Sequence, residues 1–280
     1  MKVSLGQGLK PRVRCRAEVD INKRLGANVG YAIVLLRRWR YTSPMKDRKM
    51  QLQVLYEDNH LIAVNKPAGY LSQGDQTGDV TVMDLVKEYI KVRYDKPGDV
   101  YLGSIHRLDR PVSGVIVFAR TSKALSRMTE LFRDRKVTKK YWAIVAEQPS
   151  PIEGRLEGFI YKDAKKNLSK VLPKANSNRH QGAKRAVLTY ELKGRVGSNV
   201  LLEVTPETGR PHQIRVQLAQ QLGCPIRGDL KYGFLQANED GNINLHSRSF
   251  EFLHPVKKEQ VKIIANPPRR DQIWQLFEEF

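Results

Sequence analysis

The chain has 280 residues, of which 40% are hydrophobic and 28% are charged, a composition typical of a globular protein with a sizeable core. Its net charge of +20 and its pI of about 10.0 favour an anionic partner such as a nucleic acid. The longest apolar run near the N-terminus, residues 31–36, is far shorter than the roughly 20 residues of a membrane span, and no signal-peptide cleavage site follows it. The composition therefore argues against a membrane or secreted protein.

The cysteine content points in the same direction. Cys15 and Cys224 are the two cysteines of the sequence, and their spacing suggests neither a disulfide nor a metal site. We therefore expect a reducing, cytoplasmic location.

Residues 1–49 hold half of the net positive charge, with 13 Lys and Arg against 3 Asp and Glu. Glycines are scattered among the arginines there, and no helical or strand periodicity persists. We expect residues 1–49 to be a disordered basic tail, or sequence upstream of the true start. A basic RNA-binding arm is the alternative interpretation.

Beyond this tail the apolar pattern becomes regular. Residues 52–56 and 61–65 are predicted to form two short strands joined by a polar turn. Thr81 and Ser122 are each expected to cap a helix, because apolar residues follow both at helical spacing. The β-branched run 115–119 predicts a buried strand between these helices.

The second half of the chain is predicted to contain mainly strands. Pro211 is expected in the first turn of a third helix, which Gly223 ends. The lysine- and asparagine-rich residues 162–183 are expected to form a surface excursion. A short C-terminal helix is expected, and strands at residues 141–146, 186–192, 200–205, 249–253 and 261–265. Hairpin-like groups of strands with helices between them predict one α+β domain over residues 50–280, with a mixed or antiparallel central sheet.

The densest polar run is 103–114, which leads into the predicted buried strand. A loop that enters a core strand is a rigid mount for a reactive side chain. Within it, Asp109 lies between Arg107 and Arg110, whose charges favour the ionised carboxylate that a nucleophile or base requires. The residues alone leave open the simpler interpretation, an Asp–Arg pair in a surface turn.

Two further runs carry candidate functional side chains. Arg215 borders an apolar stripe of the predicted third helix, where its guanidinium could pair with a buried carboxylate or only extend to solvent. Tyr141 follows Lys139 and Lys140 on a predicted strand. That pattern suits base stacking beside phosphate contacts, and it equally suits the core and rim of a sheet.

Other chemistries find little support. His106, His212, His246 and His254 lie in separate predicted elements without metal-ligand spacing, so no metal site is predicted. The sequence has no phosphate-binding glycine loop and no dinucleotide fingerprint. Ser113 lacks the Gly-x-Ser-x-Gly setting of a hydrolase nucleophile. With these chemistries unsupported, the remaining prediction is chemistry centred on an Asp carboxylate, in a basic protein without a cofactor.

Several ordered runs together resemble the RluA-type pseudouridine synthase family. The family's active-site run His-Arg-Leu-Asp-x-x-Thr-Ser-Gly is matched by residues 106–114, except that Val112 replaces the usual Thr and so removes a hydroxyl. The other matching runs are residues 56–69, Tyr141, 209–215, 225–233 and 245–255. The resemblance covers residues 52–265 and implies the α+β catalytic fold of that family.

The resemblance implies that uridine within RNA is isomerised to pseudouridine without a cofactor or a metal. By resemblance, Asp109 is the nucleophile, Tyr141 stacks on the flipped uracil and assists proton removal from C5, and Arg215 pairs with Asp109. Arg107 is expected to fill the gap left by the extruded nucleotide. The other residues expected to contact the substrate RNA are His106, Leu108, Arg110, Lys140, Arg210, His212 and Gln213.

The implied partner is a structured RNA, either tRNA or rRNA, and the expected enzyme is a monomer. Some family members carry an N-terminal S4 RNA-binding module, a pattern that residues 1–49 do not show. Two alternatives from other classes stay open: a catalytically silent RNA-binding protein and a metal-dependent hydrolase.

Overall fold

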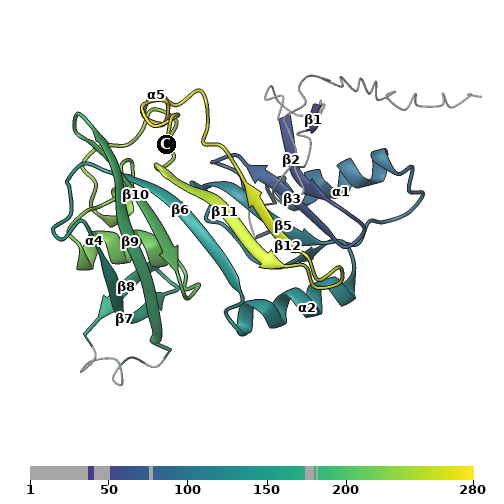
Figure 1. Cartoon of the computed structure of the whole chain (residues 1–280), viewed down its shortest axis with the longest axis horizontal. Helices are drawn as coiled ribbons and strands as arrows, with labels where there is room; N and C mark the ends of the chain where they lie inside the picture. The colour runs from purple at the N-terminus through teal and green to yellow at the C-terminus, as the bar shows by residue number, and fades with distance from the viewer. Residues whose placement is uncertain (1–36, 41–50, 76–77, 174–179, 181) are drawn as a thin grey trace, which may run out of the picture.

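The computed structural model describes residues 37–40, 51–75, 78–173, 180 and 182–280, which form a large sheet with few helices (Figure 1). The helices are α1 (Val82–Arg93), α2 (Ser122–Arg133), α4 (Gln213–Gln221) and α5 (Gln272–Gln275), with a 3-10 turn η1 (Leu230–Tyr232). The strands are β1 (Arg37–Arg40), β2 (Gln51–Glu57), β3 (Leu61–Lys66), β4 (Gly103–Ser104), β5 (Ser113–Ala119), β6 (Val137–Val145), β7 (Glu153–Asp163), β8 (Leu168–Leu172), β9 (Lys184–Val196), β10 (Asn199–Pro206), β11 (Leu245–Leu253) and β12 (Gln260–Ile264). The predicted α+β class is confirmed.

The described strands form one sheet in the order β1-β2-β3-β5-β11-β6-β10-β9-β7-β8, with β12 on β11 and β4 on β5. All of these neighbours pair antiparallel except β5 and β11, which run parallel where Ser113 and Gly114 face His246 and Ser247. This junction joins the first strands of the chain to the later ones. It also places the loop that enters β5 close to β6, because β11 pairs with both.

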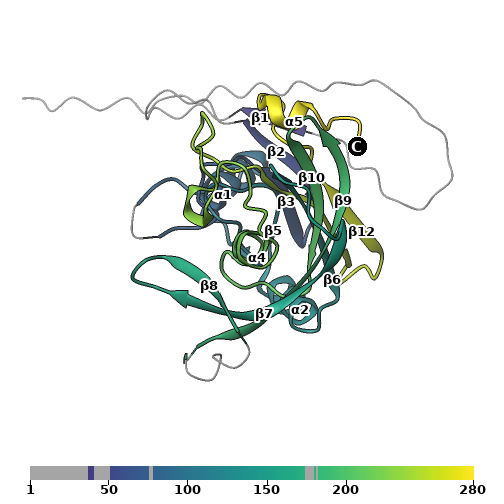
Figure 2. The same cartoon turned by 90° about the vertical axis from the view of Figure 1, so that its left-hand side faces the viewer.

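Helices pack on both faces of the sheet, so alternating residues of one strand contact different helices. Ile62 and Val64 of β3 belong to the core cluster that contains α1 and α4, whereas Leu61 and Ala63 pack in the cluster that contains α2. Likewise α5 packs on Trp142, whose neighbours along β6 face the α4 side. In Figure 2, α4 lies within the curve of β7, β9 and β10.

Some predicted element boundaries were wrong for local reasons. The N-cap of α2 is Thr121, whose hydroxyl accepts from Ala124 N at 3.1 Å, and Ser122 is the first helical residue. Helix α4 begins at Gln213, because His212 has a left-handed backbone (φ 54°), so Pro211 precedes the helix.

The predicted surface excursion over residues 162–183 instead contains the end of β7 and all of β8, which pair as a hairpin. Strand β7 was not predicted at all. The tail prediction for residues 1–49 falls outside the described residues except at 37–40, which form β1 against β2.

Gly114 lies at the parallel junction with a left-handed backbone (φ 114°), and a Cβ there would collide with the backbone of Ser247. We expect Gly114→Ala to lower the free energy of unfolding by about 1–3 kcal/mol or more, because strain and overpacking add. Chemical denaturation measures this loss. The matched control is Gly98→Ala, whose Cβ would meet nothing within 4 Å, and it should change stability by no more than about 0.5 kcal/mol. Equal stabilities of the two variants would contradict the prediction.

Candidate active site

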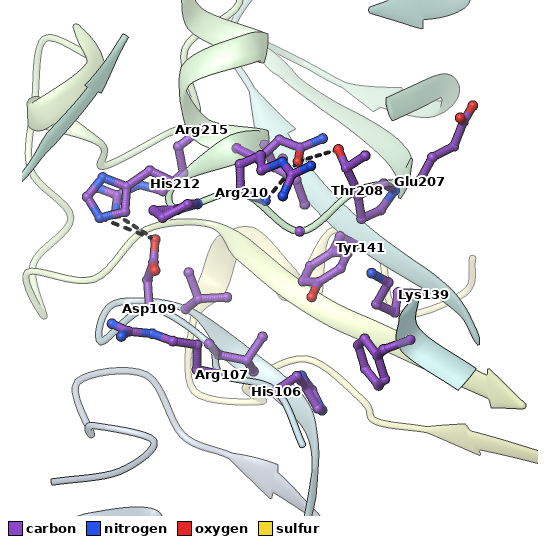
Figure 3. Close-up of a pocket in the computed structure, with 18 of the residues that line it drawn as sticks. His106, Arg107, Asp109, Lys139, Tyr141, Glu207, Thr208, Arg210, His212 and Arg215 are labelled. Carbon is purple, nitrogen blue, oxygen red and sulfur yellow. Dashed lines mark hydrogen bonds and ion pairs between the residues drawn. The ribbon is translucent and has the colours of Figure 1, made fainter. Parts of the chain in front are cut away.

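A cavity of about 650 Å³ opens beside the loop that enters β5 (Figure 3). Residues 105–109 line one side, residues 206–215 line the other, and β6 contributes Lys139 and Tyr141. The three residues with predicted catalytic roles, Asp109, Tyr141 and Arg215, all line this cavity. So do six of the residues expected to contact the substrate: His106, Arg107, Leu108, Arg210, His212 and Gln213.

Two of the predicted substrate contacts lie apart from the cavity lining. Arg110 turns to the preceding loop, where its Nε donates to Gly69 O at 3.0 Å and its Nη1 pairs with Asp79 at 2.9 Å. The Lys140 ammonium pairs with Glu203 Oε1 at 2.7 Å. Lys140 alternates along β6 with Tyr141, so the two side chains point to opposite faces of the sheet.

The backbone on both sides of Asp109 is anchored to the end of β3 and to the segment that follows it. Ser72, which is buried, donates from Oγ to Leu108 O at 2.8 Å and accepts from Leu108 N at 3.0 Å. The fully buried Lys66 donates from Nζ to Arg110 O at 3.1 Å. Burial lowers the pKa of Lys66 to about 7, although the negative charge of Asp109 opposes that shift. Asp109 is therefore mounted between two immobilised peptide groups.

Arg215 lies between two carboxylates. Its Nε and Nη2 donate to both oxygens of Asp229 at 2.7 and 2.8 Å, and its Nη1 donates to Asp109 Oδ2 at 3.1 Å. The Asp229 side chain is 1% exposed and the Asp109 side chain 22%. Burial by itself would lower the pKa of Arg215, but the bonds and charges of Asp229 and Asp109 outweigh it and raise the pKa. Asp109 thus has a permanently charged partner and still reaches the cavity.

His212 approaches the same carboxylate from the N-terminus of α4, as Figure 3 shows. Its Nε2 lies 4.0 Å from Asp109 Oδ2, and its Nδ1 lies 2.6 Å from Tyr232 Oη. Burial lowers the pKa of His212 to about 4, against the opposing charge of Asp109. The ring is therefore neutral at neutral pH.

Tyr141 is buried on the floor of the cavity, 9% exposed. Burial raises the pKa of Tyr141 to about 12; a hydrogen bond with Ser247 opposes this rise, and the charge of Asp109 adds to it. The side chain is therefore a neutral phenol at neutral pH, and it lines the same cavity as Asp109.

His106 lines the cavity and also contacts other protein groups with its ring. Its ring stacks on Phe132 and Phe250, with centroid distances of 5.7 and 5.0 Å, and its Nε2 accepts from Val117 N at 3.0 Å. Burial, together with the charge of Lys139, lowers the pKa of His106 to about 3. The imidazole therefore ties the active-site loop to β5 as a neutral group.

This arrangement predicts a pH effect on stability. The folded-state pKa of His106 lies below its ordinary value of 6.5. The stability that neutral His106 contributes to the fold is therefore complete above pH 6.5 and is lost as pH falls towards about 3. We expect the free energy of unfolding, measured by urea denaturation, to fall between pH 7 and pH 5. In His106→Gln that fall should be smaller by roughly 2 kcal/mol, since glutamine has no proton to take up. Identical pH dependence in the two proteins would refute this role.

Gln213 and Thr208 are bound mainly to protein groups. The Gln213 amide accepts from Thr208 Oγ1 at 2.8 Å and from Arg210 N at 3.0 Å, and it donates to Val187 O at 2.9 Å. These bonds secure the turn before α4. Arg210 in turn donates from Nε to Arg185 O at 2.9 Å, and its side chain is among those that line the cavity.

The structure adds residues to which sequence reasoning gave no role. Asp229 and Tyr232 lie in the run 225–233, one of those that resemble the family, so the resemblance could have drawn attention to them. Ser72 and Lys162 carry no comparable signal. Lys162 lines the cavity from β7, and together with Arg107, Arg133, Arg135 and Lys139 it makes the rim strongly basic.

The described residues contain no group of three or more His, Cys, Asp or Glu side chains arranged to hold a metal ion. Among the described helices, none is both long enough and apolar enough to cross a membrane.

Comparisons with known proteins agree on one family. The model of the RNA pseudouridylate synthase family matches residues 60–220. The ribosomal large subunit pseudouridine synthase C of Buchnera aphidicola is 32% identical over 282 residues, which span 94% of this chain and 77% of that protein. The tRNA pseudouridine synthase C of Haemophilus ducreyi is 33% identical over 246 residues, 82% of this chain and 96% of that protein.

Solved structures show the same likeness. Human RNA pseudouridylate synthase domain containing 4 superposes with a TM-score of 0.64 and 26% identity, covering 80% of this chain and 91% of that one. Its human relative, domain containing 1, shares the fold with a TM-score of 0.61 and 23% identity, covering 80% and 87%.

Proposed function

We propose that Asp109 is the nucleophile of this chain. The chain belongs to the RNA pseudouridylate synthase family and is an RNA pseudouridine synthase, which is an isomerase. The observation that carries the proposal is the setting of the Asp109 carboxylate. Its Oδ2 is engaged by Arg215, while Oδ1 has no hydrogen-bond partner among the residues that the structure describes. One oxygen is thereby held in place and the other is available for attack.

The reaction breaks the N1–C1′ bond of uridine and forms a C5–C1′ bond, with a proton leaving C5 and a proton returning to N1. An ionised carboxylate supplies the electron pair, whether it attacks C1′ or C6 of the uracil. Arg215 holds this carboxylate in its orientation through the hydrogen bond from Nη1 to Oδ2. Neither a redox change nor a carrier group is needed for this balance, so we propose that no cofactor takes part.

The uracil has to leave its stack to reach Asp109, and flipping a base costs a few kcal/mol, which stacking in the pocket offsets. We propose that the Tyr141 ring stacks on the flipped base and that Arg107, exposed on the rim, occupies the gap in the RNA. The cavity of about 650 Å³ is large enough for one nucleoside.

The roles of the Tyr141 ring and hydroxyl can be separated. We expect Tyr141→Phe to retain RNA affinity within a few-fold, because the stacking ring remains, and to slow turnover by roughly a hundredfold or more, because the hydroxyl assists proton transfer at C5. Tyr141→Leu should lose affinity as well. Single-turnover rates and filter-binding affinities measure the two effects. If Tyr141→Phe turned over at the rate of the original protein, the hydroxyl would have no part in the chemistry.

The proposed substrate is structured RNA, tRNA or rRNA, since the named relatives act on one or the other. The basic rim would contact phosphates around the target nucleotide through Arg107, Arg133, Arg135, Lys139 and Lys162. We further propose that the enzyme is a monomer in the cytoplasm; the two cysteines without disulfide spacing support that location.

The decisive experiment uses the purified chain of 280 residues and transcripts of tRNA and rRNA carrying tritium at C5 of uridine. Isomerisation releases the C5 proton, so the expected result is time-dependent release of tritium. Chemical mapping of pseudouridine should then place it at defined positions. Metal chelation should leave the rate unchanged if no metal takes part. Absence of release from every transcript, with RNA still bound, would support the catalytically silent alternative.

A further inference from the structure

His212 combines features that are rare in one residue. It has a left-handed backbone (φ 54°), it occupies the N-cap of α4 without a side-chain capping bond, and its side chain is 8% exposed. Non-glycine residues in this conformation are uncommon and gather at functional sites. The ring is thus directed away from the helix backbone, with Nε2 towards Asp109 and Nδ1 towards Tyr232.

The hydrogen bonds of Tyr232 define what it offers to His212. Its Oη accepts a hydrogen bond from the buried backbone N–H of Ser169 at 2.9 Å. The phenolic proton remains, and His212 Nδ1 lies 2.6 Å away. If Tyr232 donates this proton, Nδ1 is the acceptor and the neutral imidazole carries its own proton on Nε2.

The other end of the ring requires the same arrangement. Nε2 lies 4.0 Å from Asp109 Oδ2, and an unprotonated Nε2 there would set a lone pair against a carboxylate. We infer that Tyr232 is a positioning residue that holds His212 as the Nε2–H tautomer, so that this N–H faces Asp109 within the active site.

Tyr232 also lies under the second partner of the carboxylate. The Arg215 guanidinium is 5.1 Å from the centroid of the Tyr232 ring. Tyr232 therefore contacts both side chains that are directed at Asp109 Oδ2, the charged Arg215 and the neutral His212. The distance of 4.0 Å is long for a hydrogen bond, and such contacts often shorten when substrate binds. The inference rests on the proposed function of Asp109, because it assigns these donors to keeping Oδ2 engaged while Oδ1 attacks.

The charged form of His212 is the competing state, because an imidazolium would donate from both nitrogens. The charge of Asp109 favours it, whereas burial and the charges of Arg215, Lys162 and Lys231 disfavour it. Burial has the larger effect and keeps the pKa at about 4, well below neutrality.

The first test measures the tautomer directly, without any RNA. Protein labelled with ¹⁵N-histidine contains six such residues, and the His212 signals are those missing from His212→Gln. Long-range ¹H–¹⁵N correlation at neutral pH should show a protonated Nε2 and an unprotonated Nδ1 for His212. In Tyr232→Phe only Asp109 still favours the proton on Nε2, so the fraction of the Nε2–H tautomer should fall measurably below that in the unaltered protein. A protonated Nδ1 in the unaltered protein overturns the inference.

The second test asks whether Tyr232 acts through His212. Tyr232→Phe should lower kcat at least about tenfold and change KM for RNA less than about twofold, because the RNA-facing rim is untouched. In a His212→Gln background, where the amide N–H replaces the imidazole N–H and has no tautomer, Tyr232→Phe should have little further effect. If Tyr232 only packs beneath Arg215 and Ser169, its loss costs the same in both backgrounds, and the positioning role is rejected.

The two tests also separate this inference from the proposed function. If the protein releases no tritium from any RNA, the function fails while the tautomer measurement still stands. If it releases tritium but Tyr232→Phe keeps the full kcat, the function stands and the positioning role fails. Thermal melting of each variant shows whether a loss of activity reflects unfolding.

Discussion

Asp109→Asn is expected to abolish pseudouridine formation while leaving RNA binding intact. The amide keeps the shape of the side chain but removes the negative charge and the nucleophilic oxygen, so the rate should fall by at least about a thousandfold. The surrounding bonds are made by Ser72 to Leu108 and by Lys66 to Arg110, and they do not depend on the side chain of Asp109. The folded structure and the RNA-binding rim should therefore persist.

The measurement is tritium release under single-turnover conditions, with RNA affinity and the melting temperature followed in parallel. Asp99→Asn is a suitable control, since Asp99 is an exposed carboxylate that does not line the cavity. It should retain nearly full activity. A rate for Asp109→Asn within about tenfold of the original would exclude Asp109 as the nucleophile.

Arg215→Ala is expected to reduce both stability and catalysis. Removing the guanidinium leaves Asp229, 1% exposed, as a buried charge without its bidentate partner. Breaking a buried pair in this way typically destabilises a protein by about 3–5 kcal/mol. Asp109 also loses the donor that orients Oδ2, which should slow turnover by roughly a hundredfold.

A double variant separates these two losses. In Arg215→Met with Asp229→Leu, both buried charges of the pair are removed, so most of the lost stability should return. Activity should not return, because Asp109 still lacks its partner. Urea denaturation and single-turnover rates on the single and double variants test this directly. Recovery of activity together with stability would mean that Arg215 serves the fold and not the reaction.

The parts of this fold that the sequence predicts are those whose cause is local. The capping box of Thr81 and Asp84 begins α1, and the uninterrupted apolar run of β5 is buried along its whole length. Both signals lie within a few residues of the element they specify. The parts that were missed depend on distant partners. Strand β7 has few buried residues, and its pairing with β9 and β8 decides its conformation.

The same distinction holds in the site. The family resemblance identified Asp109, Tyr141 and Arg215 from the sequence runs around them. In the structure these three side chains line one cavity. The start of α4 could not be predicted from Pro211, because His212 takes a left-handed backbone in a setting supplied by Tyr232 and Asp109. Asp229 is likewise recognised as a partner of Arg215 only after folding brings the two carboxylates to one guanidinium.

The parallel junction of β5 and β11 has a consequence for the order of events during synthesis. The pair Ser113 and His246 that bridges it is separated by 133 residues, and the contact of Asp109 with Arg215 spans 106. Domains fold as their chain emerges from the ribosome, and long-range contacts form only once both segments are free. A nascent chain that exposes the Asp109 loop therefore has no assembled active site. We therefore expect the proposed site to become reactive towards RNA only after nearly the whole domain has been translated.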